Sequence, residues 1–265
     1  MNKKAALEAF KSYADFYDTD DIKIKLKIDH TYRVADIASR IGTSVGADPD
    51  FSWFLGLLHD IGRFEQLTQY GTFKDADSVD HAELGADILF KDGLIESFPN
   101  PSDTVGLEDK RLIAETAIRL HNKLSLPGGL DEKTLLYCKI LRDADKADIF
   151  RVLTEPPYDE RNDMIVENSA DMGPTRDDVM QCVHEHRCVP QRSDFTPFEA
   201  FISQCCMAFE LEFPESVKIV REQGYLWQLM NLEVRSVSMS EQLETLRAEM
   251  ERVWEDKCVV HKDHR

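Results

Sequence analysis

Four histidines and two aspartates of this sequence carry the side chains that bind transition metals, and each lies on or next to an apolar helical stripe. They are His30, His59, Asp60, His81, His121 and Asp145. The stripes, such as those over residues 34–41 and 51–58, repeat apolar residues at i, i+3, i+4 and i+7. This spacing is typical of one face of an amphipathic helix. We therefore expect all six side chains on the inward faces of five helices.

Burial of so many ionisable groups without partners would cost several kcal/mol for each group. A metal removes this cost, because neutral imidazoles and carboxylates coordinate it and it supplies the missing positive charge. Four histidines and two aspartates are enough nitrogen and oxygen ligands for two ions that share one bridging carboxylate. The ligand types suit Fe, Mn, Co, Ni or Zn.

A simpler interpretation applies to each histidine taken alone. A histidine on an apolar helix face is more often a core residue that hydrogen-bonds to a carbonyl group. An adjacent His-Asp pair is also common by chance. The prediction of a metal centre therefore rests on the joint pattern and not on any one of its members.

The ordered motifs resemble the HD-domain metal-dependent phosphohydrolases, whose pattern is H…HD…D. The strings that carry the resemblance are KIDHTYRVA, LGLLHDIGRFE and ILRDADKAD, which hold His30, His59-Asp60 and Asp145. His81 in DHAELGA and His121 in RLHNKL resemble the additional ligands of two-metal members, H…HD…H…H…D. The alternative is a one-metal site in which these two histidines contact the substrate phosphate instead.

The resemblance implies hydrolysis of a phosphate ester by a metal-activated water, with Asp60 bridging two ions and Asp145 orienting the water. Arg63 lies one helical turn after Asp60, where its guanidinium can clamp a phosphate oxygen and stabilise charge on it. An ion pair of Arg63 with Glu65 or another acid is the competing interpretation. Asn122 and Lys146 are further candidates for contact with the substrate.

Some branches of the superfamily fit poorly. The cyclic-di-GMP phosphodiesterases have a second histidine where this chain has Asn122, and a GYP string where it has LPGG. Deoxynucleoside 5′-monophosphate phosphatases carry an acid at the position of Arg63. Two alternatives to hydrolysis stay open: a di-iron oxygenase, which uses the same ligand set, and a non-catalytic regulatory module that binds a nucleotide or metal.

The composition of the chain limits the classes of binding partner and the cellular compartment that we expect. The 265 residues include 50 acids and 32 Lys or Arg, a net charge of −18, which argues against general binding to nucleic acids or anionic membranes. We expect a small phosphorylated substrate, with nucleotides among the candidates, and leave the oligomeric state open. No run reaches the roughly 20 apolar residues of a membrane helix. The start of the chain lacks the pattern of a secretory signal, so a cytoplasmic protein with reduced thiols is predicted.

The elements that must position these residues are helices separated by proline-marked turns. We predict an all-α, single-domain helical bundle of the HD-domain type over residues 1–265, with an HD-domain core at 22–150 and a helical extension at 175–265. The alternating residues 22–28 are assigned to the start of a helix. Segments 98–109 and 154–174 are predicted loops, and the charged tail from Ser236 is predicted to be an exposed helix.

One cysteine- and histidine-rich string needs a separate interpretation. CVHEHRC, residues 182–188, has a spacing unlike the usual zinc sites. We expect it to form a helix on which its cysteines and histidines are spread over different faces, and therefore to bind no zinc.

Overall fold

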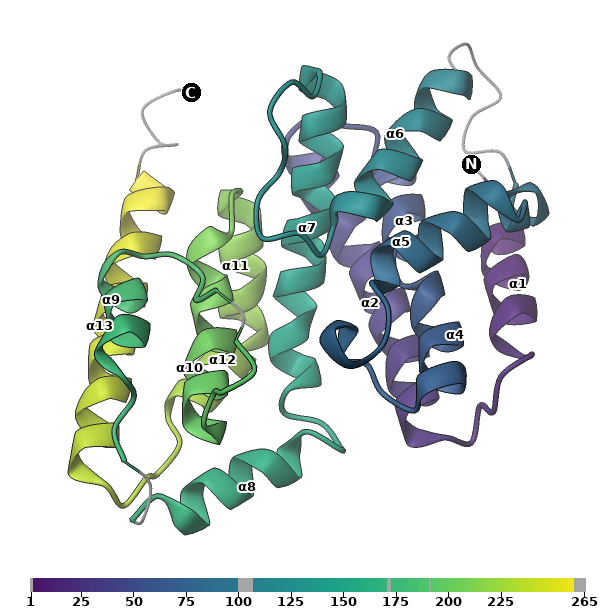
Figure 1. The fold of residues 1–265 in the computed structure, drawn as a ribbon. Coiled ribbons are helices and arrows are strands. Elements are labelled where there is room, and N and C mark those ends of the chain that lie inside the picture. The colour runs from purple at the N-terminus through teal and green to yellow at the C-terminus, as the bar shows by residue number, and fades with distance from the viewer. Residues whose placement is uncertain (1, 100–106, 171–172, 191, 260–265) are drawn as a thin grey trace. The chain divides into compact units, whose positions relative to one another are not determined.

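Helices and the turns that connect them make up the part of the protein described by the computed structural model, which comprises residues 2–99, 107–170, 173–190 and 192–259 (Figure 1). Within these ranges there is no β-strand, and the prediction of an all-α fold is confirmed. The residues pack into two compact units, Met1–Asp145 and Lys146–Arg265. The boundary lies within helix α7, near the predicted end of the HD-domain core at residue 150. The single domain over residues 1–265 stays a prediction.

Within its described residues, the first unit contains six helices and the start of a seventh. They are α1 (Lys3–Ala14), α2 (Ile22–Ser44), α3 (Pro49–Leu58), α4 (Ile61–Tyr70), α5 (His81–Ala86), α6 (Leu107–Leu120) and α7 (Glu132–Val152). Short 3-10 turns η1 (Asp75–Asp77) and η3 (Leu94–Ser97) and a π turn η2 (Asp87–Lys91) connect them. Most of the predicted loop 98–109, residues 100–106, lies outside the described residues.

The described part of the second unit contains six further helices and one 3-10 turn. They are α8 (Asp159–Asn168), α9 (Asp177–His184), α10 (Pro197–Cys206), η4 (Met207–Glu210), α11 (Pro214–Gln223), α12 (Tyr225–Met230) and α13 (Val237–Val259). Helix α8 corrects the prediction of a loop over 154–174. Its buried Ile165 and Asn162 anchor a segment whose acidic composition suggested an exposed loop.

Aspartates begin the helices that lead to the predicted ligands. The side chain of Asp21 accepts a hydrogen bond from the backbone N–H of Lys23, and Asp48 does so from Asp50 and Phe51. These bonds satisfy N–H groups that have no acceptor within the first turn of a helix. Helix α2 therefore starts at Ile22, and the prediction that the alternating residues 22–28 are helical is confirmed.

Two glycine contacts set how closely the helices of the first unit pack. A Cβ atom on Gly56 of α3 would lie 2.6 Å from the Cα atom of Ala35 on α2. A Cβ on Gly62 of α4 would lie 2.6 Å from the backbone nitrogen of Gly85 on α5. Real Cβ atoms do not approach this closely, so glycine is required for both contacts. They bring α3 against α2 and α5 against α4, and thereby bring the HD motif close to His30 and His81.

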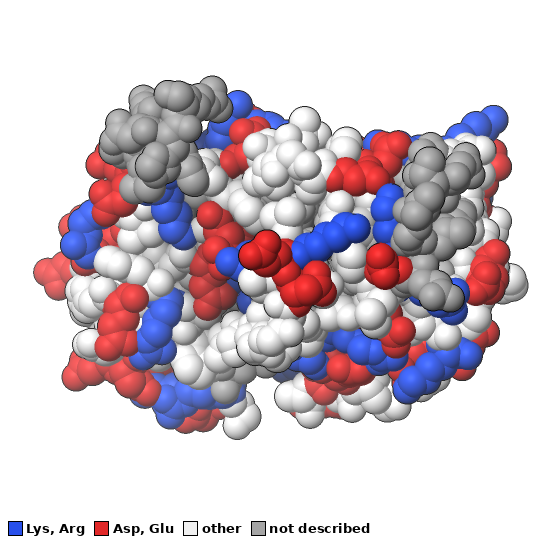
Figure 2. Space-filling model, turned by 90° about the horizontal axis from the view of Figure 1, so that it is seen from above, with Lys and Arg blue, Asp and Glu red and all other residues white. Residues whose placement is uncertain are grey.

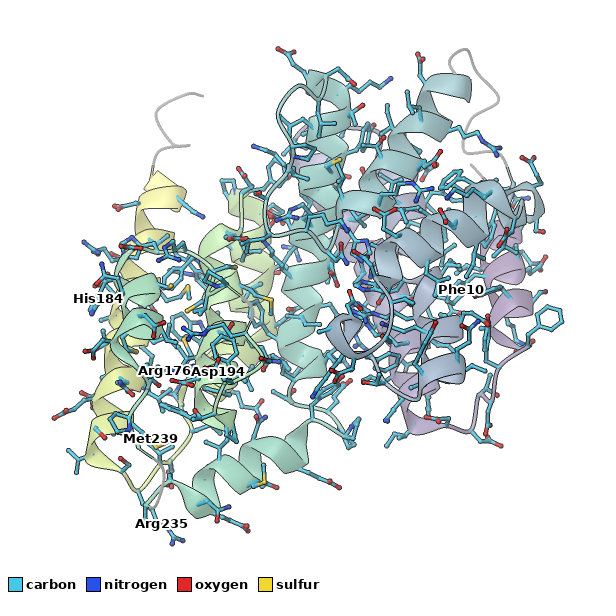
Figure 3. All side chains as sticks on the ribbon, viewed as in Figure 1. Phe10, Arg176, His184, Asp194, Arg235 and Met239 are labelled. Carbon is cyan, nitrogen blue, oxygen red and sulfur yellow. The ribbon has the colours of Figure 1, made fainter. Side chains whose placement is uncertain are left out.

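Helix α1 packs on the same unit, although the predicted core begins only at residue 22. The ring of Phe10, labelled in Figure 3, is fully buried and meets Phe64 of α4 edge-on with centroids 6.0 Å apart. The hydroxyl of Tyr13 donates to the backbone oxygen of Ile61, at 3.0 Å. Ile61 directly follows Asp60, so α1 helps to fix the start of α4 beside the HD motif.

Helix α13 is present as predicted, but it is not an exposed helix. Five apolar residues at spacings of three and four form a buried stripe along it: Met239, Leu243, Leu246, Met250 and Trp254. Met239, labelled in Figure 3, begins this stripe. The indole N–H of Trp254 donates to the carbonyl oxygen of Ala208 at 3.2 Å. The charged residues between the apolar ones occupy the outer face, which is why composition alone suggested exposure.

Charged side chains of both signs are interspersed on the face of the molecule in Figure 2. Arg176 and Asp194, labelled in Figure 3, form an ion pair with 2.9 Å between Nη1 and Oδ2. Among the described helices, none combines the length and the apolar character needed to cross a membrane.

Candidate metal centre

The HD motif occupies the junction between α3 and α4. His59 directly follows the last residue of α3, and Asp60 precedes the first residue of α4. An aspartate at this position commonly caps the helix, but the side chain of Asp60 makes no capping hydrogen bond. Its carboxylate, only 3% exposed, points instead toward the histidines. The junction therefore presents a buried carboxylate whose two oxygens are available for other contacts.

One oxygen of Asp60 faces the first pair of histidines. Oδ2 lies 3.6 Å from Nε2 of His30 on α2 and 3.4 Å from Nε2 of His59. Oδ1 of Asp145 on α7 approaches the same two nitrogens, at 3.2 Å from His30 and 3.7 Å from His59. Two imidazoles and two carboxylates thus converge on this side of Asp60.

The other oxygen of Asp60 faces the second pair. Oδ1 lies 3.6 Å from Nε2 of His81 on α5 and 3.7 Å from Nε2 of His121, which follows α6. The two Nε2 atoms are 3.0 Å apart. Asp60 therefore lies between two histidine pairs and presents a different oxygen to each. All six predicted ligands are brought together in this way within the first unit.

Hydrogen bonds on the outer side of the rings orient the imidazoles. Nδ1 of His59 lies 2.7 Å from the carbonyl oxygen of Gly56, and Nδ1 of His121 lies 2.7 Å from that of Ile118. A carbonyl oxygen only accepts, so each Nδ1 carries a proton and donates it to the carbonyl, and each Nε2 faces the centre. Nδ1 of His81 lies 2.7 and 2.9 Å from the two oxygens of Asp75.

The charges and the burial of the centre shift the pKa values of its residues. Burial acts to raise the pKa of Asp60, but the positive charges of Lys27 and His59 outweigh it and hold the pKa well below its ordinary range. Burial lowers the pKa of His59, yet the carboxylates of Asp60 and Asp145 raise that pKa to about 10. Burial together with the charge of Arg63 lowers the pKa of His81 to about 4. Without a metal, Asp60 and Asp145 are thus ionised and His59 is protonated, whereas His81 is a neutral imidazole at neutral pH.

The residues fit a divalent metal. Nε2 of His59 is buried and makes no hydrogen bond, although two carboxylates lie within 4 Å. In three overlapping sets of three residues, the possible ligand atoms lie within 4.8 Å of one another. The sets are His30–His59–Asp60, His59–His121–Asp145 and Asp60–His81–His121. Buried nitrogen and carboxylate donors at this spacing suit a transition-metal ion, which supplies the positive charge between them.

Lys27 belongs to this centre and was missed by the sequence analysis. Its ammonium donates to Oδ2 of Asp60 at 2.6 Å and lies 5.6 Å from the ring centroid of Phe73. Lys27 precedes His30 by three residues on α2, so both share one helix face. That spacing was available in the sequence, but the alternation of lysines with apolar residues over 22–28 concealed it.

Arg63 lies at the edge of the centre, where it is partly committed to neighbouring groups. Its Nη1 donates to Gln66 at 2.8 Å, to the backbone oxygen of Phe73 at 2.6 Å and to Asp75 at 3.0 Å. Its Nε is buried without a hydrogen bond, 3.6 Å from Oδ1 of Asp60. The acid that binds it is thus Asp75 and not Glu65, while Nε still faces the centre.

The other two predicted substrate contacts have protein partners. The amide nitrogen of Asn122 donates to Asp75 at 3.2 Å and to Asp80 at 2.8 Å. The ammonium of Lys146 donates to Glu210 at 2.7 Å, and both of these residues belong to the second unit. Contact of Asn122 and Lys146 with a substrate stays a prediction.

The string over residues 182–188 is helical only at its start. Helix α9 ends at His184, and His186 adopts a left-handed backbone with φ of 55°. The prediction of a helix across the whole string is therefore wrong. Nε2 of His186 lies 2.8 Å from Oε2 of Glu249 on α13, and this contact holds the turned chain against that helix.

Comparison with known families agrees with this geometry. Residues 28–149 match the family model of the HD domain. This part of the chain is therefore an HD domain and belongs to a superfamily of metal-dependent hydrolases, so the resemblance predicted from the motifs is confirmed. Searches of curated proteins and of solved structures found no match.

Proposed function

We propose that this protein hydrolyses a small phosphate ester with two divalent transition-metal ions as cofactors. The observation that supports it best is the position of Asp60 between two histidine pairs. Oδ2 faces His30 and His59 while Oδ1 faces His81 and His121, so one carboxylate can bridge two ions. With Asp145 on the first side, the six side chains form two adjacent half-sites.

When bound, such ions would lower the pKa of a water so that it loses its proton to solvent near neutral pH and becomes a nucleophile, and they would supply positive charge beside the phosphoryl oxygens. The protein supplies the orientation. Asp145, whose side chain is 25% exposed, lies at the solvent-accessible side of the first half-site and orients the attacking water. Arg63 binds a phosphoryl oxygen through its buried Nε, which stabilises charge that develops there.

Arg63 also favours a phosphate ester over the substrate of a di-iron oxygenase. A fixed guanidinium is a strong hydrogen-bond donor to phosphate oxygens. The hydrogen bonds from Nη1 to Gln66 and Asp75 hold the plane of this guanidinium in place beside Asp60. The class of substrate is therefore a small phosphomonoester or diester, a nucleotide among the candidates. The cytoplasm stays the predicted compartment.

The test is metal content per chain, measured on protein prepared without chelator or nickel-affinity resin, for the wild type and His81→Ala. We expect two ions in the wild type and one in His81→Ala. A panel of phosphate esters then tests turnover, with Asp60→Ala as the inactive variant. Phosphatase activity retained by Asp60→Ala would falsify the proposal.

The identity and number of the bound ions distinguish the hydrolase from the oxygenase and from the regulatory module. If the bound metal is iron and the protein consumes oxygen when a substrate is added, the protein is an oxygenase and the proposal is wrong. Two ions without turnover on the phosphoester panel or uptake of oxygen would favour a regulatory module. A single ion, unchanged in His81→Ala, would remove His81 and His121 from the ligand set.

A further inference from the structure

The segment between α4 and α5 carries a carboxylate that faces the outer side of a predicted ligand. Asp75 lies in the 3-10 turn η1, and both of its oxygens contact Nδ1 of His81, at 2.7 and 2.9 Å. Nε2, on the opposite side of the same ring, lies 3.6 Å from Oδ1 of Asp60. Asp75 thus contacts the imidazole at the nitrogen that faces away from the centre.

The position of His81 in its helix explains why a side chain is needed there. His59 and His121 each bond through Nδ1 to the backbone oxygen three residues earlier, of Gly56 and Ile118. His81 is the first residue of α5, so the residue three positions earlier lies outside that helix. Because the helix offers no such carbonyl, the acceptor comes from η1. This acceptor is the negatively charged carboxylate of Asp75, whereas His59 and His121 use a neutral carbonyl group.

Asp75 is itself held by three further donors. Nη1 of Arg63 and the amide nitrogen of Gln66 bind Oδ1, at 3.0 and 2.9 Å, and the amide of Asn122 binds Oδ2 at 3.2 Å. These contacts fix the carboxylate and, through it, the ring of His81. They also connect the same carboxylate to Arg63, the proposed phosphate contact.

We propose that Asp75 is a positioning residue for the half-site formed by His81, His121 and Oδ1 of Asp60. Its carboxylate accepts a hydrogen bond from the Nδ1–H group of His81, which leaves the Nε2 lone pair for the metal, and it fixes the angle of the ring. A carboxylate behind a ligating imidazole also increases the electron density at Nε2. This inference rests on the metal centre of the proposed function and adds the group that orients its third histidine.

A different role for Asp75 is less consistent with its surroundings. Asp75, Asp80 and His81 also lie close enough to one another to hold an ion of their own. However, Asp80 caps α5 through the N–H groups of Ala82 and Glu83 and pairs with Lys123. Arg63 already forms an ion pair with Asp75. An ion between these carboxylates would meet two resident cations, so Asp75 acts from behind the ligand and not as a ligand.

The test is titration of metal-free protein with Co²⁺, followed by its visible absorption, which reports coordination as well as binding. Asp75→Ala is compared with Asp77→Asn, a matched control on the same turn whose exposed side chain lies 3.8 Å from Lys74. In Asp75→Ala we expect one of the two ions to bind roughly 10- to 100-fold more weakly, with the spectrum of that site changed. Asp77→Asn should match the wild type.

Asp75→Asn provides a second variant that keeps the size of the side chain and an acceptor oxygen. Its affinity for the weaker ion should lie between those of the wild type and Asp75→Ala. Thermal unfolding in chelator checks that each variant is folded before titration. A simple packing role would lower stability without changing the affinity or the spectrum of only one site.

Three results would overturn the proposal. They are unchanged affinity for both ions in Asp75→Ala, a wild type that binds only one ion, and a third ion whose binding alone requires Asp75. Failure of the proposed function would give a different result. The protein would then turn over no phosphate ester, while Asp75→Ala would still bind one of the two ions more weakly than the wild type does.

Discussion

Gly62 of α4 and Gly85 of α5 touch backbone to backbone. A Cβ atom on Gly62 would lie 2.6 Å from the backbone nitrogen of Gly85 and 2.3 Å from the carbonyl oxygen of His81. The HDIGR and HAELGA strings therefore depend on each other through their glycines. This contact brings the first residue of α5 next to Asp60, and with it the second half-site of the centre.

Replacement of Gly62 by alanine should separate the two helices. The added methyl group meets backbone atoms, which cannot rotate away as a side chain can, and overpacking of this kind costs about 1–3 kcal/mol. We expect Gly62→Ala to bind one metal ion in place of two, measured by metal analysis, with a lower urea midpoint. Gly128→Ala is the control, since no heavy atom lies within 4 Å of its added Cβ. Two tightly bound ions in Gly62→Ala would show that the close contact is not needed for the centre.

Removal of the Lys27 charge should have opposite effects on stability and metal affinity. Lys27 and Asp60 form a buried ion pair, and breaking such a pair from one side costs about 3–5 kcal/mol because the other charge stays buried. Lys27→Met should lose this much stability in urea unfolding with chelator present. It should also bind metal more tightly, because Lys27 and the ion are both positive and meet at Oδ2 of Asp60.

The exposed Lys25 on the same helix gives the control for Lys27. Lys25→Met changes the same charge without breaking a buried pair, so its stability and metal affinity should stay near those of the wild type. Equal stability of Lys27→Met and Lys25→Met without metal would argue that the pair with Asp60 contributes nothing.

Acid should weaken the second unit through Glu249. The hydrogen bond with His186, together with Arg252 and His184, outweighs desolvation and lowers the pKa of Glu249 from 4.5 to about 2. A carboxyl whose pKa is lower in the folded state stabilises above its unfolded pKa, and this contribution is lost as pH falls from about 4.5 to about 2. The stability difference between wild type and Glu249→Gln should therefore shrink between pH 5 and pH 2.5 in urea titrations. Glu255→Gln, exposed on the same helix, should show no such trend.

The buried face of α13 can be tested at Trp254. Its side chain is fully buried, and its ring meets Trp227 edge-on with centroids 5.8 Å apart. Trp254→Ala should cost about 3–5 kcal/mol of unfolding free energy, the range for a buried aromatic residue. Glu255→Ala, one residue later on the exposed face, should change stability by less than about 0.5 kcal/mol. If both substitutions change the unfolding free energy by similarly small amounts, the prediction of an exposed helix would be supported instead.

Several features of the site could be predicted because they depend on local sequence. The phase of a helix is set by its residues, so a ligand near an apolar stripe must lie on the buried face. This argument predicted that His30, His59 and His121 face inward, and all three are buried in the structure. The order of the motifs added Asp145 and His81, and residues 28–149 then matched the HD domain.

Errors arose where composition was taken as a guide to exposure. Helix α13 is rich in charge, yet five apolar residues at helical spacing bury one side of it. Segment 154–174 is acidic and proline-rich, yet it contains helix α8 with Ile165 fully buried. In both cases the few apolar residues of a segment determined its packing, because burial follows the apolar face and not the average composition.

By itself, the sequence determined the all-helical character of the fold, the motif order and the inward direction of the predicted ligands, since each follows from spacing along one segment. Only the tertiary structure decided which groups meet them. Lys27 contacts Asp60 across 33 residues, and Asn122 contacts Asp75 across 47. Asp75 lies only six residues before His81, but on a turn without periodicity that leaves no pattern in the sequence. Contacts of these kinds depend on how buried faces and loops pack together, and no local spacing encodes that.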